Sequence, residues 1–486
     1  MKIPVNRITL CNKNSLNFEG DYVLYWMIAN RRTTWNYSLQ HAADYADLLQ
    51  KPLVILEALR CGYPWASDRL HKFIIDGMVA NQQALAHKPV TYYPYIEPEA
   101  GAGKGLLASL ASRACVVITD DFPAFMLPAM INAAAQQVPV RMEKVDSNGL
   151  LPMRSCAEVF PTAYAFRRYI QKNLAQHLGD FPEADPLDGR YIPSPYNLEA
   201  SITRRWPQAD LHSFQKNAQH LQNLPIDHSV VTVDELGGAL EASSTLQRFL
   251  DSRLAKYSEL RNQVQTEVTS GLSPYLHFGH ISVHEIFQSV AMGENWSPEM
   301  LAPTTRGNRE GWWGMSAAAE AFLDELITWR ELGFNMCTNN SKYAAYESLP
   351  HWALTTLAEH EQDARPYVYT LQDFEQAQTH DALWNAAQVQ LLREGRIHNY
   401  LRMLWGKKIL EWTSSPREAL AVMIELNNKY ALDGRDPNSY SGIFWVLGRY
   451  DRAWGPERPV FGKIRYMSSD NTRRKMQVDD YIRKYS

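Results

Sequence analysis

Hydrophobic and polar positions follow two different patterns along the chain. Up to about residue 150, short apolar runs are separated by amphipathic stretches of helical period. The apolar runs, which predict buried strands, are residues 21–29, 52–59, 90–96, 114–121 and 139–145. The helical stretches between them lie near residues 36–49, 66–86, 103–113 and 124–136. Strands that alternate with helices at this spacing predict a doubly wound parallel sheet.

The pattern changes near residue 180, where the stretch DFPEADPLDGRYIPSPYN is rich in Pro, Asp and Gly. This composition is typical of a linker or a long surface crossing. No strand pattern follows residue 236, and helical periodicity continues over residues 236–260, 278–292, 315–337, 352–361, 380–394, 396–413 and 415–428. We therefore predict an α/β domain at residues 1–180, a linker crossing at 181–235 and an all-α domain at 236–486.

Composition narrows the class of protein. A chain of 486 residues with 45% hydrophobic and 21% charged residues is ordered and exceeds one ordinary core. The five cysteines are scattered and include no CxxC pair, which favours reduced thiols in a cytoplasmic protein over a disulfide framework or a zinc site. No run of eighteen apolar residues and no apolar leader of signal-peptide type occurs, so we expect no membrane span.

Charge is distributed unevenly. The net charge of −4 does not by itself favour a polyanionic partner. However, Lys and Arg outnumber Asp and Glu over residues 390–486. A local basic face is compatible with nucleic acid, although a solvated surface of mixed charge is the commoner cause.

Two stretches suggest chemistry without defining it. Residues 269–273 (TSGLS) precede Pro274, which suits a helix start that presents backbone N–H groups to an anion such as a pyrophosphate. The histidines that follow, at 277, 280 and 284, have no carboxylate or cysteine to complete a ligand set, so we expect no metal site. The stretch RIHNYLRMLWGKKILEW, at 396–412, is helical and combines polar groups with two tryptophans seven residues apart on one face. By itself it also fits a core helix with satisfied polar groups.

Six motifs of the helical half together carry a family resemblance. In chain order they are LSPYLHFGHIS, DELITWREL, HDALWNAAQ, HNYLRMLWGKKILEW, LDGRDPN and ERPVFGKIRYM. They resemble the photolyase/cryptochrome superfamily, and most closely its class II cyclobutane pyrimidine dimer photolyases. The likeness covers about 235–486 and is much thinner over 1–230. It implies an FAD-binding helical domain and light-dependent repair of UV-damaged DNA that contains pyrimidine dimers.

The resemblance assigns a set of residues to FAD. They are Tyr257, Thr269, Ser270, Gly271, Leu272, Ser273, Arg402, Asn427, Asp433 and Asn438. Arg402 and Asp433 match a pair beside the isoalloxazine ring, where a cation favours an anionic reduced flavin and the carboxylate keeps that cation paired. Asn427 matches the amide at the reactive N5 edge, and Asn438 is the alternative if the register differs. An amide can both donate and accept a hydrogen bond.

The same resemblance assigns the substrate contacts. Glu325 corresponds to the glutamate that binds the carbonyl edge of the dimer, and Trp329 and Trp445 to an aromatic clamp. Asn399 and Met403 line the same pocket. Asn399 stands where many class II members have glycine and is closer to the class I pattern. Enzymes for (6-4) photoproducts carry further histidines at these positions, so the cyclobutane lesion is favoured.

The tryptophans of the helical half match an electron relay. Trp405, Trp384 and Trp412 correspond, in that order outward from the flavin, to the class II chain of indoles. Such a line can carry an oxidising equivalent, because indole is oxidised more readily than most side chains. Any one of the three alone also fits an ordinary core residue.

DNA contacts, a second pigment and rival functions complete the expectations. A dimer must leave the duplex stack to reach a buried flavin. Basic residues after 448 would hold the phosphates without reading sequence. Those assigned to the DNA backbone are Arg449, Arg452, Lys463 and Arg465.

An antenna pigment, deazaflavin or folate, is possible in the α/β domain, but the opening of that domain, YWMIANRRTTWNYSL, resembles class II only loosely. We expect a monomer. The rivals are a cryptochrome-like blue-light receptor with FAD and no repair, and a flavoprotein that binds DNA without catalysis.

Overall fold

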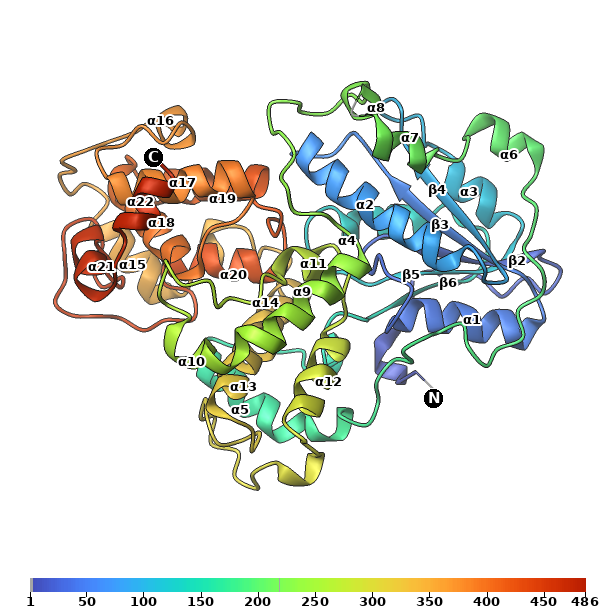
Figure 1. The fold of residues 1–486 in the computed structure, drawn as a ribbon, viewed down its shortest axis with the longest axis horizontal. Helices are drawn as coiled ribbons and strands as arrows, with labels where there is room; N and C mark the ends of the chain where they lie inside the picture. The colour runs from blue at the N-terminus through green and yellow to red at the C-terminus, as the bar shows by residue number, and fades with distance from the viewer. Residues whose placement is uncertain (1–2, 218) are drawn as a thin grey trace. The chain divides into compact units, whose positions relative to one another are not determined.

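The computed structural model describes residues 3–217 and 219–486 (Figure 1). The chain divides into two compact units that each draw on separate stretches of sequence. The first comprises Met1–Cys156, Leu174–Gln247 and Leu272–Met292, and the second Ala157–Asn173, Arg248–Gly271 and Gly293–Ser486. The predicted boundaries after 180 and 235 do not coincide with this division, because 157–173 pack in the helical unit and 272–292 pack with the sheet.

The first unit is built on a six-stranded sheet with the order β1-β6-β5-β2-β3-β4. The strands are β1 (Ile8–Leu10), β2 (Tyr22–Met27), β3 (Leu53–Leu59), β4 (Val90–Ile96), β5 (Ala114–Asp120) and β6 (Met142–Val145). All neighbouring pairs are parallel except β1 with β6. The predicted doubly wound α/β domain is therefore confirmed. The edge strand β1 was not predicted, because three residues are too few to show an alternating pattern.

Helices cover both faces of this sheet. The helices of the first unit are α1 (Tyr37–Leu49), α2 (Asp68–Leu85), α3 (Leu106–Ala111), α4 (Leu127–Ala135), α6 (Ala200–Arg205), α7 (Leu211–Lys216), α8 (Gln219–Gln222), α11 (Ser273–His277) and α12 (Val283–Gly293). Helix α1 packs on Val23, Tyr25 and Met27 of β2. On the opposite face, the Tyr22 hydroxyl donates to the Leu110 carbonyl at the end of α3. Burial on both faces explains why β2 is an uninterrupted apolar run.

A buried carboxylate orders the carboxyl edge of the sheet. Asp120, the last residue of β5, accepts hydrogen bonds on one oxygen from the backbone N–H groups of residues 28–30, at 2.8–2.9 Å. Its other oxygen accepts from the Tyr25 hydroxyl and the Asn30 side chain. Because every donor meets the same carboxylate, the loop after β2 is held in one conformation.

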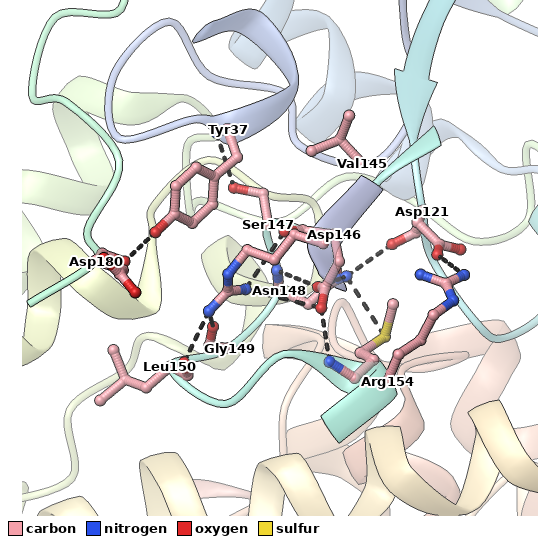
Figure 2. A network of polar contacts seen from close by, with 12 residues as sticks. Tyr37, Asp121, Val145, Asp146, Ser147, Asn148, Gly149, Leu150, Arg154 and Asp180 are labelled. Carbon is pink, nitrogen blue, oxygen red and sulfur yellow. Dashed lines mark hydrogen bonds and ion pairs between the residues drawn. The ribbon is translucent and has the colours of Figure 1, made fainter. Parts of the chain in front are cut away.

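The loop after β6 is held in the same way by Asp146 (Figure 2). Its carboxylate accepts from the backbone N–H of Asn148 at 3.1 Å and of Met153 at 2.7 Å. Buried Arg7 donates to the carbonyls of Gly149 and Leu150 at 3.1 and 2.7 Å. This network fastens the N-terminal segment to the end of the sheet.

Residues 272–292 belong to the first unit because they pack directly on its loops. The ring of Phe278 lies 5.2 Å from that of Phe73 on α2. Gly279 has φ +72°, and a Cβ at this position would lie 1.9 Å from the Ala29 carbonyl oxygen, so only glycine allows the approach. The Gly279 carbonyl in turn accepts from the Arg32 side chain at 3.1 Å.

The second unit is helical, as predicted. Its helices are α5 (Ala163–Asn173), α10 (Tyr257–Leu260), α13 (Ala317–Leu323), α14 (Arg330–Asn339), α15 (His351–Glu359), α16 (Leu371–Glu375), α17 (Ala382–Glu394), α18 (Asn399–Trp412), α19 (Pro416–Tyr430), α20 (Pro437–Val446), α21 (Ser469–Lys475) and α22 (Asp479–Lys484). Helix α9 (Ala239–Ser252) contains the boundary between the units. A π-helical turn, Asp324–Trp329, joins α13 to α14.

Local signals in the sequence set the ends of the helices around the site. Asp381 caps α17 by accepting from the N–H groups of Leu383 and Trp384, and Gly395 ends that helix in the left-handed conformation. Asp436 caps α20, where proline occupies the first position. These caps fix where α17 and α20 begin and where α17 ends.

No helix within residues 3–217 and 219–486 is long and apolar enough to cross a membrane.

Candidate functional site

Three tryptophans from α17 and α18 form a line of contacting indoles. The rings of Trp384 and Trp405 are nearly parallel, with centroids 6.4 Å apart and an interplanar angle of 4°. The ring of Trp412 lies 6.2 Å from that of Trp384 at 67°. Trp384 therefore contacts both other indoles, and all three are at most 2% exposed. The structure brings together the three residues that the resemblance assigned to a relay.

Polar neighbours hold the first two indoles. The Trp405 Nε1 group donates to Oε1 of Gln388 at 2.9 Å, and Trp384 Nε1 donates to the Trp405 carbonyl at 3.0 Å. Amide oxygens are poor proton acceptors, so these bonds orient the rings without offering a base to remove the indole proton. Gln388 was not identified from the sequence, because its role depends on the packing of α17 against α18.

Trp412 ends the line of indoles below the surface. Its ring contacts His380 at 4.9 Å and Tyr369 at 5.7 Å. The Tyr369 hydroxyl and His380 Nδ1 are hydrogen-bonded at 2.7 Å, and the exposed ring of Tyr367 stacks on His380 at 3.7 Å. The aromatic contacts therefore continue from the last indole to solvent-exposed rings.

An ion pair lies one turn before Trp405 on α18. Arg402 donates through Nη2 to both oxygens of Asp433, at 3.0 and 3.2 Å. Both side chains are mostly buried. Within the described residues, Arg402 has no other acceptor, so its Nε and Nη1 groups remain available to a ligand. The structure thus pairs the two residues that the resemblance placed beside the flavin ring.

The loop that carries Asp433 is wrapped around Asn427 and Asn428. A Cβ at Gly434 would lie 2.7 Å from the Asn427 carbonyl oxygen, so this close turn requires glycine. The side chain of Asn428 accepts from the Arg435 backbone N–H at 3.0 Å, and Arg435 has φ +68°. Asn428 was not identified from the sequence, although two adjacent asparagines a few residues before the DGRD motif were a signal for it.

The two candidate amides differ in exposure. Asn427 is buried, and its Nδ2 group donates to the Ser439 hydroxyl at 2.7 Å. Its Oδ1 atom accepts no hydrogen bond from any described residue. Asn438 lies in the first turn of α20 and is exposed. The buried position of Asn427 suits contact with an enclosed ligand better than that of Asn438.

The segment assigned to the pyrophosphate contains the boundary between the units. Thr269, Ser270 and Gly271 belong to the second unit, whereas Leu272 and Ser273 belong to the first. Helix α11 begins at Ser273 with proline in its first turn, as predicted, and Leu272 is its N-cap.

The residues before this segment lie in the second unit. The Thr269 carbonyl accepts from Arg253 at 3.3 Å. Tyr257 is buried, and its ring meets those of Phe249 and Phe322 edge-on at 5.8 and 5.7 Å. Arg261 follows one turn later, with its guanidinium 5.7 Å from the Tyr257 ring. Tyr257 therefore borders Arg261, which binds the Glu325 carboxylate.

Glu325 and Trp329 both lie in the π-helical turn. The Arg330 N–H donates to the Glu325 carbonyl, five residues earlier, as this wider turn requires. The Glu325 carboxylate binds Arg261 at 2.7 Å, while 32% of its side chain remains exposed. Burial raises the pKa of Glu325 above its ordinary value, and the positive charge of Arg261 opposes this rise. Neither Arg261 nor the π turn was predicted from the sequence.

A second ion pair holds this turn to helix α5. Asp324 binds Arg167 of α5 through two hydrogen bonds, at 2.6 and 2.9 Å, and both side chains are buried. A bidentate pair of this kind fixes direction as well as distance. Because Asp324 adjoins Glu325, the pair restrains the backbone turn that carries Glu325.

Helices α18 and α20 contribute the remaining substrate candidates. Asn399, at the start of α18, is exposed, and Met403 is half-buried. The Met403 methyl group lies 3.6 Å from the Cβ position of Gly442 on α20, three residues before Trp445. Met403 and the clamp residue Trp445 are thus brought to neighbouring parts of two packed helices.

A buried lysine lies beside Trp445. The Nζ group of Lys407 is 4.9 Å from the Trp445 ring and donates to the Val446 carbonyl at 2.6 Å. Burial lowers the pKa of Lys407 from 10.5 to about 7; Asp451 opposes this shift and Arg465 adds to it. Lys407 was not singled out from the sequence, because a lysine on a helix is usually exposed.

The lowered pKa of Lys407 predicts that the free energy of unfolding rises with pH. Between about pH 7 and 10.5 the unfolded chain binds a proton at this lysine that the folded chain has released, so the free energy of unfolding increases with pH. The gain should be on the order of a few kcal/mol. In Lys407→Met, thermal unfolding followed from pH 7 to 10 should lack this rise, whereas Lys463→Met, at an exposed site, should retain it. Parallel pH profiles for wild type and Lys407→Met would contradict the assignment.

The basic residues assigned to DNA fall into two groups. Arg449 is 4% exposed and donates to the Tyr343 carbonyl at 2.9 Å, so its assignment to the phosphate backbone is wrong. Its guanidinium supports the packing of α20, over Phe444. The hydrophobic surroundings of an arginine in a basic segment cannot be read from the local sequence.

The other three basic residues reach the surface. Arg452 and Lys463 are exposed, and Arg465 is half-buried between the rings of Trp454 and Trp445, at 4.1 and 5.3 Å. Lys463 also pairs with an exposed glutamate, Glu457, at 3.1 Å. These residues continue the surface that begins at Trp445.

The histidines after the pyrophosphate segment serve the packing of the first unit. His280 stacks on Phe73 at 5.2 Å and accepts from the Gly238 N–H at 2.9 Å. His284 meets Tyr37 edge-on at 5.4 Å. In the part of the chain that the structure describes, no group of three or more His, Cys, Asp or Glu residues could hold a metal ion.

Comparison with known proteins places the chain in a family. It is 32% identical over 485 residues to a deoxyribodipyrimidine photo-lyase of Methanothermobacter thermautotrophicus, covering 99% of this chain and 98% of the relative. A relative of the same name from Oryza sativa subsp. japonica is 34% identical, over 95% of this chain and 87% of its own. One from Potorous tridactylus is 30% identical, over 97% and 82%. No family model matches the sequence.

A solved structure shares the fold. The crystal structure of a bacterial class III photolyase from Agrobacterium tumefaciens has a TM-score of 0.66 and 16% identity, over 96% of this chain and 86% of that one. A sheet unit, a helical unit and full-length similarity together define the class: the chain belongs to the photolyase/cryptochrome superfamily, in the family of deoxyribodipyrimidine photo-lyases. Photolyases generally use FAD.

Proposed function

We propose that the chain splits cyclobutane pyrimidine dimers in UV-damaged DNA in a light-dependent reaction, with FAD held by the helical unit. The observation that carries this proposal is the arrangement on α18. Within four consecutive residues, Arg402 points to Asp433, Met403 lies against α20 and Trp405 begins the line of indoles. One helix thus carries the residues proposed for three roles: contact with the flavin ring, contact with the substrate and electron transfer.

The polar groups of the second unit fit a flavin. Arg402 has donors left for an acceptor, and its charge is balanced by Asp433 at 3.0 Å. Asn427 is buried with an unused Oδ1 atom, which suits a ring N–H. Arg402, Asp433 and Asn427 would hold the cofactor; Tyr257 and the segment 269–273 are proposed for its phosphate side. When bound, FAD would supply the light-excited electron that opens the dimer.

Glu325 is proposed to recognise the carbonyl edge of the dimer. Burial raises its pKa, so the neutral acid, which can donate a hydrogen bond to a carbonyl, is more accessible than for an exposed glutamate. Without substrate, Arg261 holds the carboxylate at 2.7 Å. A lesion would therefore compete with Arg261 for Glu325. Trp329 and Trp445, both partly exposed, are the proposed aromatic walls.

Other parts of the assignment also stay proposals. A second chromophore, deazaflavin or folate, would fit the carboxyl edge of the sheet near β2 and β5, where the strand order reverses, since open α/β sheets bind ligands there. The likeness to class II enzymes, a monomeric state and a cytoplasmic location stay predictions.

Illumination of the reduced holoprotein with an oligonucleotide that contains one thymine dimer tests the proposal. We expect intact thymines to be restored under near-UV or blue light and not in the dark. Flavin binding without repair would instead support the cryptochrome-like alternative. A protein that neither retains nor binds FAD would overturn the whole assignment.

A further inference from the structure

The loop between α12 and α13, residues 294–316, remains outside the site described above. Packing and hydrogen bonds hold this loop to the second unit. Its two adjacent tryptophans, Trp312 and Trp313, are buried, and the Trp296 indole donates to the Trp313 carbonyl at 2.6 Å. Glu320 of α13 accepts from the backbone N–H groups of Gly314 and Met315 at 2.9 and 3.3 Å. The base of the loop is thus packed on the second unit.

The outer part of the loop is held by the helix that positions Glu325. The Gly307 N–H donates to Gln171 of α5 at 2.6 Å, and Gln171 donates back to the Asn308 carbonyl at 2.9 Å. One turn earlier on α5, Arg167 binds Asp324, which adjoins Glu325. Helix α5 therefore fixes the loop and the carboxylate turn to one rigid support.

The residues on either side of this anchor are exposed and basic. Arg306 and Arg309 flank Gly307 and Asn308, and both arginines are exposed. Neither makes a hydrogen bond or ion pair with any residue that the structure describes. Arg309 is close enough to Glu325 for its charge to lower the pKa of that carboxyl. One acid, Glu310, shares the segment, so 306–310 carries a net positive charge.

Some exposed arginines of this unit form ion pairs, whereas others, such as Arg168 and Arg474, form none with the residues that the structure describes. Arg417 binds Glu347 at 2.6 Å, and Arg483 binds Asp480. Arg306 and Arg309 are exposed, unpaired and adjacent to the anchored backbone of Gly307 and Asn308, and the charge of Arg309 reaches the proposed substrate carboxylate, so both are placed to receive an external anion. The rigid anchoring lowers the conformational entropy that binding would cost.

We infer that residues 306–309 contact the DNA backbone beside the extruded dimer, with Arg306 and Arg309 each neutralising a phosphate. The inference rests on the proposed function, because it names the partner of the same site. Guanidinium groups suit phosphate through their fork of N–H donors, and such contacts position a duplex without reading its sequence. The loop adds a second basic element to the one formed by Arg452, Lys463 and Arg465.

The salt dependence of DNA binding tests this inference. Each neutralised phosphate contributes about −0.9 to the slope of log affinity against log salt concentration. The Arg306→Gln, Arg309→Gln double variant should therefore lower the slope by about 2, so that its affinity falls about tenfold less than that of the wild type between roughly 50 and 200 mM salt. The probe is a duplex with one thymine dimer, and binding is followed by fluorescence anisotropy.

A matched control removes two paired arginines from elsewhere in the unit. The double variant Arg417→Gln, Arg483→Gln has the same change in net charge. Arg417 lies on α19 and Arg483 on α22, and both helices are at the other end of the helical unit from the loop (Figure 1). The control should keep the slope of the wild type. Flavin retention should be unchanged in both double variants, and repair per absorbed photon at saturating DNA should be unchanged in the control.

The outcomes separate the inference from the proposed function. An unchanged slope in Arg306→Gln, Arg309→Gln, with a wild type that still binds and repairs dimer DNA, overturns only the assignment of the loop. An equal loss of slope in both double variants overturns it as well, since the effect would then follow net charge alone. A wild type with no salt-dependent binding of dimer DNA overturns the loop assignment and the proposed function together.

Discussion

Trp384→Phe should slow the light-driven reduction of bound, oxidised flavin by about tenfold or more, which corresponds to about 1.4 kcal/mol of activation free energy. Trp384 is the indole that contacts both others, at 6.4 Å from Trp405 and 6.2 Å from Trp412. Its loss leaves a phenyl ring, which is much harder to oxidise, in the middle of the route. Repair by protein that has been reduced chemically should be nearly unaffected, because in the proposed reaction the electron passes from the flavin to the dimer without the line of indoles.

The measurement is the flavin absorbance under blue light with an external reductant. Trp206→Phe is a suitable control, since Trp206 is a buried tryptophan of the first unit whose indole also donates to a backbone carbonyl, at 2.9 Å. Trp405→Phe should resemble Trp384→Phe. Photoreduction at the wild-type rate in Trp384→Phe would show that electrons reach the flavin by another path.

Glu325→Ala should lower the repair yield per absorbed photon several-fold while FAD binding is retained. Glu325 binds Arg261 at 2.7 Å, whereas the residues proposed beside the flavin ring, Arg402 and Asp433, pair with each other at 3.0 Å. Removal of the carboxyl group would remove the hydrogen bond that we propose between Glu325 and the dimer carbonyl. Because Arg261 is partly exposed, solvent can hydrate it, and the fold should tolerate the change.

A pH profile with Glu325→Gln sharpens this test. Burial raises the pKa of Glu325, and only the protonated acid donates a hydrogen bond. The wild-type yield should therefore fall as pH increases through this raised pKa, whereas the amide of Glu325→Gln donates at every pH and should give a flat profile. Glu347→Gln, which breaks a comparable ion pair with Arg417 at 2.6 Å, serves as the control. A wild-type yield with the same flat profile would remove the proposed role of the acid.

Much of the site was accessible to prediction because its residues occur in continuous motifs. Arg402, Met403 and Trp405 lie within one helical turn of α18, and a helix fixes the relative directions of such neighbours. The strands of the sheet were equally clear, since β2, β3 and β5 are apolar runs buried on both faces.

Other features escaped prediction for identifiable reasons. The Arg261–Glu325 pair joins residues 64 positions apart, and the π-helical turn leaves no distinct sequence pattern. Arg449 occurs in a basic segment and was assigned to the surface, yet the packing of α20 buries it. The two compact units differ from the predicted ranges because segments 157–173 and 272–292 each pack with the other half of the chain, which helical periodicity does not reveal.

The sequence by itself determined the division into a sheet-forming and a helical half, and the order of the candidate residues along each helix, because periodicity and caps act over one or two turns. Only the tertiary structure decided which of those residues meet: Trp384 with Trp405, Arg402 with Asp433, and α5 with both the carboxylate turn and the 306–309 loop. Such contacts depend on how distant segments pack and exclude water, and no local pattern of residues encodes that.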